Sequence, residues 1–235
     1  MKLLTWNCNG AFRKKADTVL SLKPDLAVIQ ECANLTKLNL NEDAPIPSDQ
    51  LWFGNYPSKG IGIFSYGDYR LSLYENYDPA IQYCIPLQVT GPQSFHLIAI
   101  WAMPHSDRKQ SYIGQVYQAI GTYHDFIRQL DTVMLGDFNS NQQFDKASRV
   151  WNHTTVVNML DELGLVSAYH DYYREAQGSE TQPTFYLYRH QAKPLHLDYI
   201  FIPKSWMNKV SSITVGDYDQ WKEFSDHCPV TLEIQ

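Results

Sequence analysis

The stretch TVMLGDFNS, residues 132–140, joins a short apolar run to a polar end, and it decides how the rest of the chain is interpreted. The first four residues are predicted to form a buried strand that ends at Gly136. Asp137 and Asn139 then follow in the kind of loop that builds binding and catalytic sites. Taken singly, an Asp-x-Asn segment is more often a turn or a helix cap, so the neighbouring motifs must decide its meaning.

Segments on both sides of this stretch alternate between period-two and helical hydrophobic patterns. We expect strands at residues 2–8, 26–32, 61–65, 69–74, 81–89, 95–102, 132–135, 184–188, 195–202, 212–215 and 230–234, and helices at residues 12–22, 112–130 and 155–163. The strands between residues 61 and 102 follow one another without a helix, which favours hairpins. Residues 34–55 are polar and contain prolines, and we interpret them as a long irregular segment.

Both parts of the chain, residues 1–125 and 126–235, mix helices with several strands. This pattern predicts an α/β four-layer sandwich, in which two mixed β-sheets pack face to face with helices outside. The sequence contains no repeat, low-complexity tract or linker that would divide it, so we expect one domain over residues 1–235. A chain of this length can bury a large core.

Composition places the chain among ordinary globular proteins. It is 44% hydrophobic and 19% charged, which argues against disorder. The longest clean apolar stretch, residues 97–104, is far shorter than the roughly 20 residues of a membrane span. The N-terminus becomes polar at Asn7, too early for a secretory signal. We therefore expect a cytoplasmic monomer that does not interact with membranes.

The cysteines and the net charge exclude few classes of function. The four cysteines form no CxxC pair and are interpreted as buried reduced thiols, with zinc binding or a disulfide as the alternative: Cys8, Cys32, Cys84 and Cys228. The net charge of −6 argues at first against an anionic partner. However, an enzyme that binds a metal ion must concentrate carboxylates around it, so the total charge is not decisive.

Five polar motifs stand at or near the ends of expected strands. They are TWNCNG (5–10), IQE (29–31), GDFNS (136–140), LHLDYIF (195–201) and SDHCPV (225–230). Asp198 is embedded in an otherwise apolar strand, where an unpaired carboxylate is costly to bury. It therefore requires a cationic partner, and a histidine is the natural candidate.

Together and in this order, the five motifs resemble those of the endonuclease/exonuclease/phosphatase superfamily. The resemblance is nearer to exonuclease III, the abasic-site endonucleases and DNase I-like enzymes than to the lipid phosphatases, and it extends from residue 5 to residue 230. It implies the same four-layer sandwich. It also implies a divalent-metal-dependent phosphodiesterase that uses Mg²⁺ or Mn²⁺ and acts on nucleic acid, with DNA as the expected substrate.

The resemblance and the chemistry of oxygen ligands together suggest a metal site. Glu31 is the expected main ligand of a hard cation. Asn7 would help to orient the groups around the metal, and Asp226 would add a second ligand. The sequence does not decide between one and two metal ions.

The catalytic roles follow in the same way. Asp137 would position and deprotonate the attacking water, and Asn139 would donate to a phosphate oxygen or to that water. His227, held charged by Asp198, would stabilise negative charge on the non-bridging oxygens.

One position departs from the family pattern. Abasic-site endonucleases carry a tyrosine in a strand-end motif near a proline, and here Ala102 occupies that place. His105 is expected to substitute by protonating the leaving oxygen, as a histidine does in DNase I-like members; a solvated loop histidine is the alternative. Tyr112 is a further candidate, but it is expected to pack against the core.

Substrate contacts are expected from Asn9, Lys59, Arg108, Arg189 and Tyr188. A ring of cations near the strand ends would follow a phosphate backbone and make binding depend on salt, whereas scattered surface charge is the alternative. In abasic-site endonucleases, the stretch equivalent to residues 185–197 supplies an apolar sugar pocket. Its aromatic residues could equally belong to the core or stack on the bases of a single strand.

Two other classes of function stay open. A phosphatase or phosphodiesterase acting on a small-molecule or lipid-headgroup phosphate is favoured by the acidic net charge. A non-catalytic nucleic-acid-binding module is disfavoured, because Glu31, Asp137 and His227 are all present. The sequence does not separate 3′-exonuclease activity, abasic-site incision and RNA cleavage.

Overall fold

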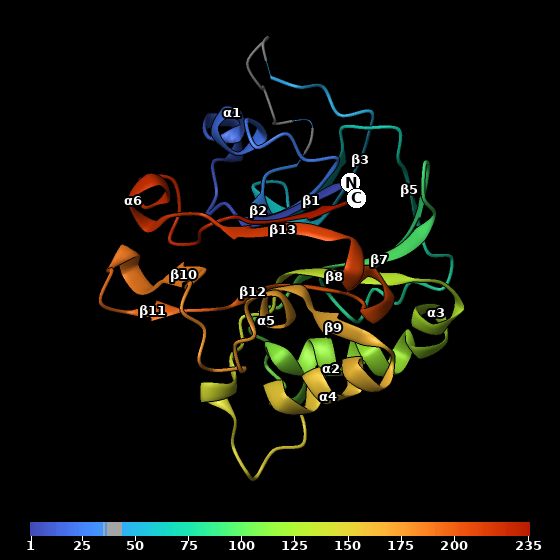
Figure 1. Cartoon of the computed structure of the whole chain (residues 1–235), viewed down its shortest axis with the longest axis vertical. Coiled ribbons are helices and arrows are strands. Elements are labelled where there is room, and N and C mark those ends of the chain that lie inside the picture. Colours follow the sequence, from blue (N-terminus) through green and yellow to red (C-terminus); the bar gives the residue numbers. More distant parts are fainter. Residues whose placement is uncertain (35, 37–43) are drawn as a thin grey trace.

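The computed structural model describes residues 1–34, 36 and 44–235, and it contains two six-stranded sheets that lie face to face (Figure 1). The first sheet has the order β13 (Val210–Val215), β14 (Val230–Ile234), β1 (Lys2–Asn7), β2 (Leu26–Cys32), β4 (Lys59–Ser65) and β3 (Asp49–Tyr56). The second has the order β5 (Arg70–Leu73), β6 (Cys84–Thr90), β7 (Phe95–Trp101), β8 (Thr132–Asp137), β12 (Asp198–Pro203) and β9 (Leu165–Ser167). A separate hairpin joins β10 (Phe185–Tyr186) and β11 (Pro194–Leu195).

The core between the sheets is made by alternate side chains of strands from both. Leu3 and Val28 of the first sheet belong to the same buried cluster as Leu97, Val133 and Ile200 of the second. Successive residues of a strand point to opposite faces, so the intervening residues face outward. They therefore need a covering layer of helices.

Helices cover the outer face of each sheet, as Figure 1 shows. The second sheet is covered by α2 (Ile113–Thr122), α3 (His124–Gln129) and α4 (His153–Glu162), which bury Ile98 and Met134. The first sheet is covered by α1 (Ala16–Leu20) and α6 (Tyr218–Trp221), which bury Trp6 and Ile29. The predicted four-layer sandwich is confirmed.

Strand register brings the polar motifs to one edge of the two sheets. β1 runs parallel to β2 and pairs Asn7 with Gln30. In the other sheet β7 runs parallel to β8, and β12 runs antiparallel to β8 with Asp198 opposite Asp137. Strands β1, β2, β8 and β12 therefore each place a polar residue at the same end of the sandwich.

Gly136 makes the close packing at this edge possible. It pairs with Ile100 of β7 and has a φ of +147°, a conformation that side chains rarely adopt. A Cβ atom at this position would overlap the carbonyl oxygen of Ile100. The glycine therefore lets the strand before Asp137 approach β7 without displacing it.

Several expected elements differ from the structure. The segment at residues 34–55 is not irregular throughout, because β3 begins at Asp49; residues 35 and 37–43 lie outside the described part. The helix expected at 112–130 is interrupted at Tyr123 between α2 and α3. The strand expected at 184–188 ends at Tyr186 and is followed by a short 3-10 turn.

Shorter elements complete the chain. The helix expected at residues 12–22 consists of the 3-10 turn η1 (Phe12–Lys14) followed by α1, and α5 (Ala168–Tyr173) follows β9. The other 3-10 turns in the described part of the chain are η3 (Arg108–Gln110), η4 (Gln142–Phe144), η5 (Leu187–Arg189) and η6 (Lys204–Lys209). Among the described residues, no helix has the length and apolar character needed to cross a bilayer.

Candidate active site

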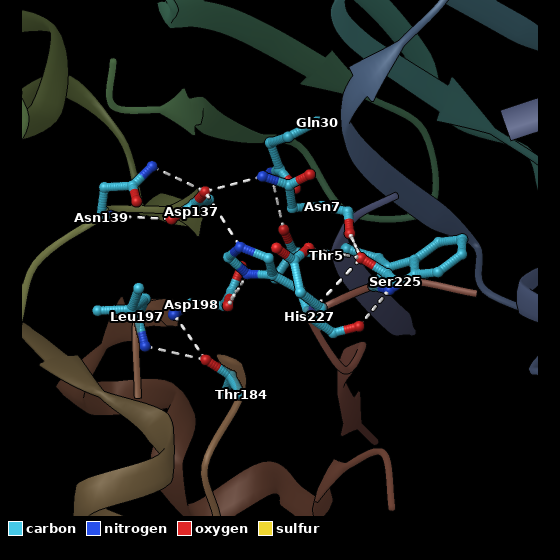
Figure 2. Close-up of polar contacts among 12 residues, drawn as sticks. Thr5, Asn7, Gln30, Asp137, Asn139, Thr184, Leu197, Asp198, Ser225 and His227 are labelled. Atoms are coloured by element: carbon cyan, nitrogen blue, oxygen red, sulfur yellow. Dashed lines mark hydrogen bonds and ion pairs between the residues drawn. The ribbon is translucent and has the colours of Figure 1, made fainter. Parts of the chain in front are cut away.

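The candidate active site lies where the ends of β1, β8 and β12 meet the segment that precedes β14 (Figure 2). Asp137 ends β8, Asp198 begins β12, and His227 comes shortly before β14. All three are buried, and one ligand atom from each lies within 4.8 Å of the others. Residues far apart in the sequence thus form one compact charged group.

Asp198 finds its cationic partner in His227. The Nδ1 atom of His227 donates to Oδ2 of Asp198 over 2.8 Å, and its Nε2 atom lies 3.9 Å from Oδ2 of Asp137. Burial lowers the pKa of His227, but the charges of Asp198 and Asp137 outweigh this effect and raise the pKa to about 10. The imidazole is therefore charged at neutral pH.

Asp137 lies at the centre of a hydrogen-bond network. Its Oδ2 atom accepts from Nδ2 of Asn7 at 3.0 Å and from Nδ2 of Asn139 at 2.9 Å, and its Oδ1 atom accepts from the Asn139 amide at 2.8 Å. Burial raises the pKa of Asp137 to about 7, in spite of the opposing charge of His227. A carboxyl group with a pKa near neutrality is well suited to accept and release a proton.

In this structure Asn139 donates its hydrogen bonds to protein groups. Its two Nδ2 hydrogens are directed to Oδ2 of Asp137 and to the carbonyl oxygen of Ala102, at 2.9 Å in each case. Its φ of +46° turns the chain back so that its amide also caps Asp137. In this structure Asn139 orients Asp137 and ties it to the end of β7.

Three supporting side chains were not identified from the sequence. Oγ1 of Thr184 accepts from the amides of Leu197 and Asp198 at 2.9 and 3.0 Å. Oγ of Ser225 donates to the carbonyl oxygen of Asn7 at 2.7 Å and accepts from the His227 amide at 3.0 Å. Ser225 stands beside a motif residue, which was an available signal; Thr184 lies outside the quoted motifs.

Gln30 is the third, and it links the two sheets beneath the site. Its Nε2 atom donates to Oγ1 of Thr5 at 2.9 Å and to the carbonyl oxygen of Ile100 at 3.1 Å. Figure 2 shows Gln30 beside Asn7, its partner in the β1–β2 register. A polar side chain buried between apolar sheets is costly unless it is bonded, so this link fixes how the sheets meet.

Glu31 forms a salt bridge with a lysine in this structure. Its Oε2 atom lies 3.1 Å from Nζ of Lys59, which also lies 5.5 Å from the centre of the Trp101 ring. Glu31 has a φ of +59° where the β2–β4 register shifts between Gln30 and Cys32. Such a bulge redirects a side chain relative to a regular strand.

The donor set fits a hard divalent cation at Glu31 better than at the buried trio. His227 is an imidazolium, which has no lone pair to offer a metal, and its charge would repel the ion. The Glu31 carboxylate offers oxygen ligands, and its partner Lys59 has a flexible side chain that is 47% exposed and can move aside for a metal ion. Beside this region, Oδ1 of Asp226 accepts from Nδ2 of Asn9 at 3.0 Å, and Oδ1 of Asn7 accepts from the Asn9 amide at 3.0 Å.

Apart from Lys59, which pairs with Glu31, the expected substrate residues are spread over three places. Asn9 is exposed beside Asp226. Tyr188, with 75% of its surface exposed, and Arg189 lie in the turn of the β10–β11 hairpin, where Nη1 of Arg189 donates to the Glu223 carbonyl oxygen at 3.4 Å. In Figure 1 this hairpin extends beyond the sandwich, next to α6.

Arg108 lies in the third place, a groove of about 1050 Å³ whose wall also includes Asn139 and Leu197. His105 is exposed in the turn just before it, and its recorded bonds are local: Nδ1 accepts from the Asp107 amide at 3.0 Å, and its amide donates to Oγ of Ser111. The solvated loop histidine is therefore the arrangement found in this structure.

The aromatic stretch is divided between two environments. The ring of Phe185 lies 4.6 Å from the ring of His227, and Leu195 lines the groove, so both border the site. Tyr186 is buried against the outer face of the first sheet. The expectation that Tyr112 packs in the core is wrong, because 44% of its surface is exposed and it lines the groove.

Comparison with solved structures supports this architecture. A variant of the 3′ phosphatase NExo from Neisseria, bound to product DNA hairpin, matches with a TM-score of 0.69 and 20% identity, covering 100% of this chain and 99% of that chain. An AP endonuclease from Archaeoglobus fulgidus matches with a TM-score of 0.70 and 16% identity, with coverages of 100% and 99%. The Xenopus laevis APE2 catalytic domain matches with 0.70 and 14%, with coverages of 100% and 91%. No curated protein sequence matches the chain.

A four-layer sandwich with a buried carboxylate–histidine centre at its strand ends defines a hydrolase of phosphate esters with the DNase I-like fold. The chain belongs to the Endonuclease/Exonuclease/phosphatase family, whose model matches residues 4–227.

Proposed function

We propose that the protein is a divalent-metal-dependent nuclease that hydrolyses phosphodiester bonds, with DNA as its substrate. The observation that carries the proposal is the buried centre of Asp137, Asp198 and His227, in which an imidazolium lies between two carboxylates. Burying three such groups is expensive and is seldom explained by stability alone. Perturbed pKa values of this kind are typical of catalytic sites.

Each residue has a chemical role in this proposal. Glu31, with Asn7 and Asp226 nearby, would hold Mg²⁺ or Mn²⁺, which supplies Lewis-acid stabilisation of the phosphate. Asp137 would accept the proton of the attacking water, since its pKa lies near neutrality.

The histidines act on the other side of the phosphate. Nε2–H of His227 would donate to a non-bridging oxygen, where negative charge increases in the transition state. Asp198 would keep His227 charged and hold its ring in place through Nδ1. His105 is proposed to protonate the leaving oxygen, which requires the exposed turn around it to close on the substrate.

Cations around the site favour a polymeric anion over a small phosphate ester. Lys59 lies at Glu31, Arg108 lies in the groove, and Arg189 lies on the hairpin, so the three cations come from separate elements. Separate cations can each contact a different phosphate of one strand. The NExo structure, bound to product DNA hairpin, has the same fold.

A turnover panel tests the proposal. The purified protein, with and without Mg²⁺, is offered abasic duplex, intact duplex, single-stranded DNA, RNA, a phosphoinositide and a sugar phosphate. Metal-dependent cleavage of one or more nucleic acids supports the nuclease. Efficient hydrolysis of a lipid headgroup or sugar phosphate alone would replace it with the small-substrate phosphatase. The proposal includes a cytoplasmic monomer, which size-exclusion chromatography and cell fractionation can test.

A further inference from the structure

A groove of about 1050 Å³ leads away from the candidate active site. Two segments line most of it. One runs from η4 towards α4 and contributes residues 143–146, 148, 149 and 151; the other connects η3 to α2 and contributes residue 108 and residues 111–113. Asn139 and Leu197 line the end of the groove nearest the site, and each neighbours a residue of the buried centre in sequence or by hydrogen bond. A molecule lying in the groove would therefore reach the catalytic centre.

The groove is positively charged. Arg108, Lys146 and Arg149 line it. Asp145 also lines it, but both oxygens of its carboxylate accept hydrogen bonds from the start of α4, from the His153 amide at 2.7 Å and the Thr154 amide at 3.0 Å. The negative charge is thus directed at a helix N-terminus, where it is stabilised, and away from a ligand. The groove suits an anion.

Two aromatic rings are exposed in the same groove. Tyr112 has 44% of its surface exposed and Phe144 has 43%. Tyr112 precedes α2 with a φ of 53° and a ψ of −123°, a conformation that glycine adopts at lower cost. Exposed rings beside cations are the combination that proteins use to bind single-stranded nucleic acid, because bases stack on the rings while cations contact phosphates.

We propose, on the basis of the nuclease function proposed above, that this groove binds unpaired nucleotides next to the scissile phosphate. Their bases stack on Tyr112 and Phe144, and their phosphates lie against Arg108 and Lys146. A paired base has its faces covered by its neighbours in the stack and cannot use these rings. The enzyme therefore prefers a strand that is unpaired beside the cleavage point. Stacking does not distinguish DNA from RNA, so both are tested.

Binding measured without metal tests this assignment independently of turnover. Fluorescence anisotropy in EDTA compares a blunt DNA duplex, the same duplex with an unpaired 3′ tail, single-stranded DNA and single-stranded RNA of the tail sequence. Tyr112→Gly and Phe144→Ala should each weaken binding of the tailed and single-stranded probes by roughly 5- to 100-fold, the range for loss of one base–aromatic stack. Binding of the blunt duplex should change much less.

The variants carry their own controls. Glycine suits the backbone of Tyr112, so the melting temperature of Tyr112→Gly should not fall, and a loss of binding cannot then be attributed to unfolding. Tyr172→Ala removes a tyrosine of similar exposure, 42%, on α5 outside the groove and should leave binding unchanged. Lys146→Gln should reduce the salt dependence of binding to the tail by about one counterion.

The outcomes separate this inference from the proposed function. If the tailed and blunt probes bind equally and Tyr112→Gly and Phe144→Ala affect neither, the groove assignment is overturned even when the enzyme cleaves DNA with Mg²⁺. Equal losses in Tyr172→Ala would overturn it too. If no nucleic acid is cleaved under any condition, the nuclease proposal itself fails. A loss confined to RNA or to DNA supports the groove and identifies which polymer it binds.

Discussion

The Nδ1 atom of His227 donates a hydrogen bond to Oδ2 of Asp198 over 2.8 Å, and both side chains are buried. The two residues come from different segments, one at the start of β12 and one before β14. Neither charge is tolerable at this depth without the other. We therefore expect them to act as a single unit in catalysis.

A double-mutant cycle tests this pairing. His227→Ala and Asp198→Asn should each lower kcat on the order of 10²- to 10⁴-fold, because each removes the imidazolium or its orientation. The double variant should lose little more than the worse single variant. If the two losses multiply, the residues act independently. Circular dichroism of each variant confirms that the fold is retained.

The rate should follow a bell-shaped dependence on pH. Asp137 must be ionised to accept a proton, and its pKa is about 7, so activity should rise through that value. His227 must be charged, and its pKa is about 10, so activity should be lost above it. Asp198→Asn removes one of the carboxylates that raise the His227 pKa and should move the alkaline limb to lower pH. An unmoved limb in Asp198→Asn would assign it to another group.

Metal dependence should centre on Glu31. A chelator should abolish turnover, and Mg²⁺ or Mn²⁺ should restore it. Glu31→Gln should weaken Mn²⁺ binding, measured by isothermal titration calorimetry, as well as lower kcat. Glu233→Gln is a matched control, since Glu233 also pairs with a lysine, Lys2, but at the surface. Full activity in chelator would contradict the mechanism.

The salt dependence of substrate binding should report the cations. KM for a nucleic acid should rise steeply with salt, and Lys59, Arg108 and Arg189 replaced singly by alanine should each reduce the slope by about one. Arg174→Ala, which breaks an exposed pair with Asp171, is the control and should leave the slope unchanged. Slopes unaffected by all three replacements would show that these residues do not touch the phosphates.

Stability in acid should depend on the buried Glu180 carboxylate behind the site. Oε1 of Glu180 lies 3.0 Å from Nε2 of His170, and Oε2 accepts from Nδ2 of Asn141 at 3.1 Å. Burial raises the pKa of Glu180, but hydrogen bonds from His170, the Gly178 amide and Asn141 outweigh it and lower the pKa to about 2.

The sign of the effect follows from this lowered pKa. The stabilisation is present above the ordinary glutamate pKa of about 4.5 and disappears as pH falls towards 2. Glu180→Gln should therefore be less stable than the parent at pH 7 by urea unfolding, and the difference should shrink below pH 4.5. The exposed Glu162→Gln serves as control. A pH-independent difference would point to lost packing instead of lost charge.

Sequence patterns predicted the fold class because the central strands are apolar and clearly delimited. The edge strand β3 was missed, since its residues are only partly buried and the prolines before it indicate a loop. The break at Tyr123 was also missed, because the apolar residues of α2 and α3 continue the same helical spacing.

At the site, the sequence indicated that Asp198 needs a cation, because a buried carboxylate has few alternatives. It did not indicate that Nδ2 of Asn139 donates to Asp137 and to Ala102, or that Lys59 pairs with Glu31. Those contacts depend on how strands far apart in the chain are brought together. Residue type and local spacing carry no such information.

The position of β14 between β13 and β1 affects when the enzyme can first act. Asn7 and His227 meet around Asp137, although 220 positions separate them in the sequence. During translation, a nascent chain held on the ribosome before residue 227 has emerged cannot complete the constellation, whatever earlier segments have already folded. A polypeptide with the proposed activity would thus remain unable to cleave its substrate until synthesis has passed that point.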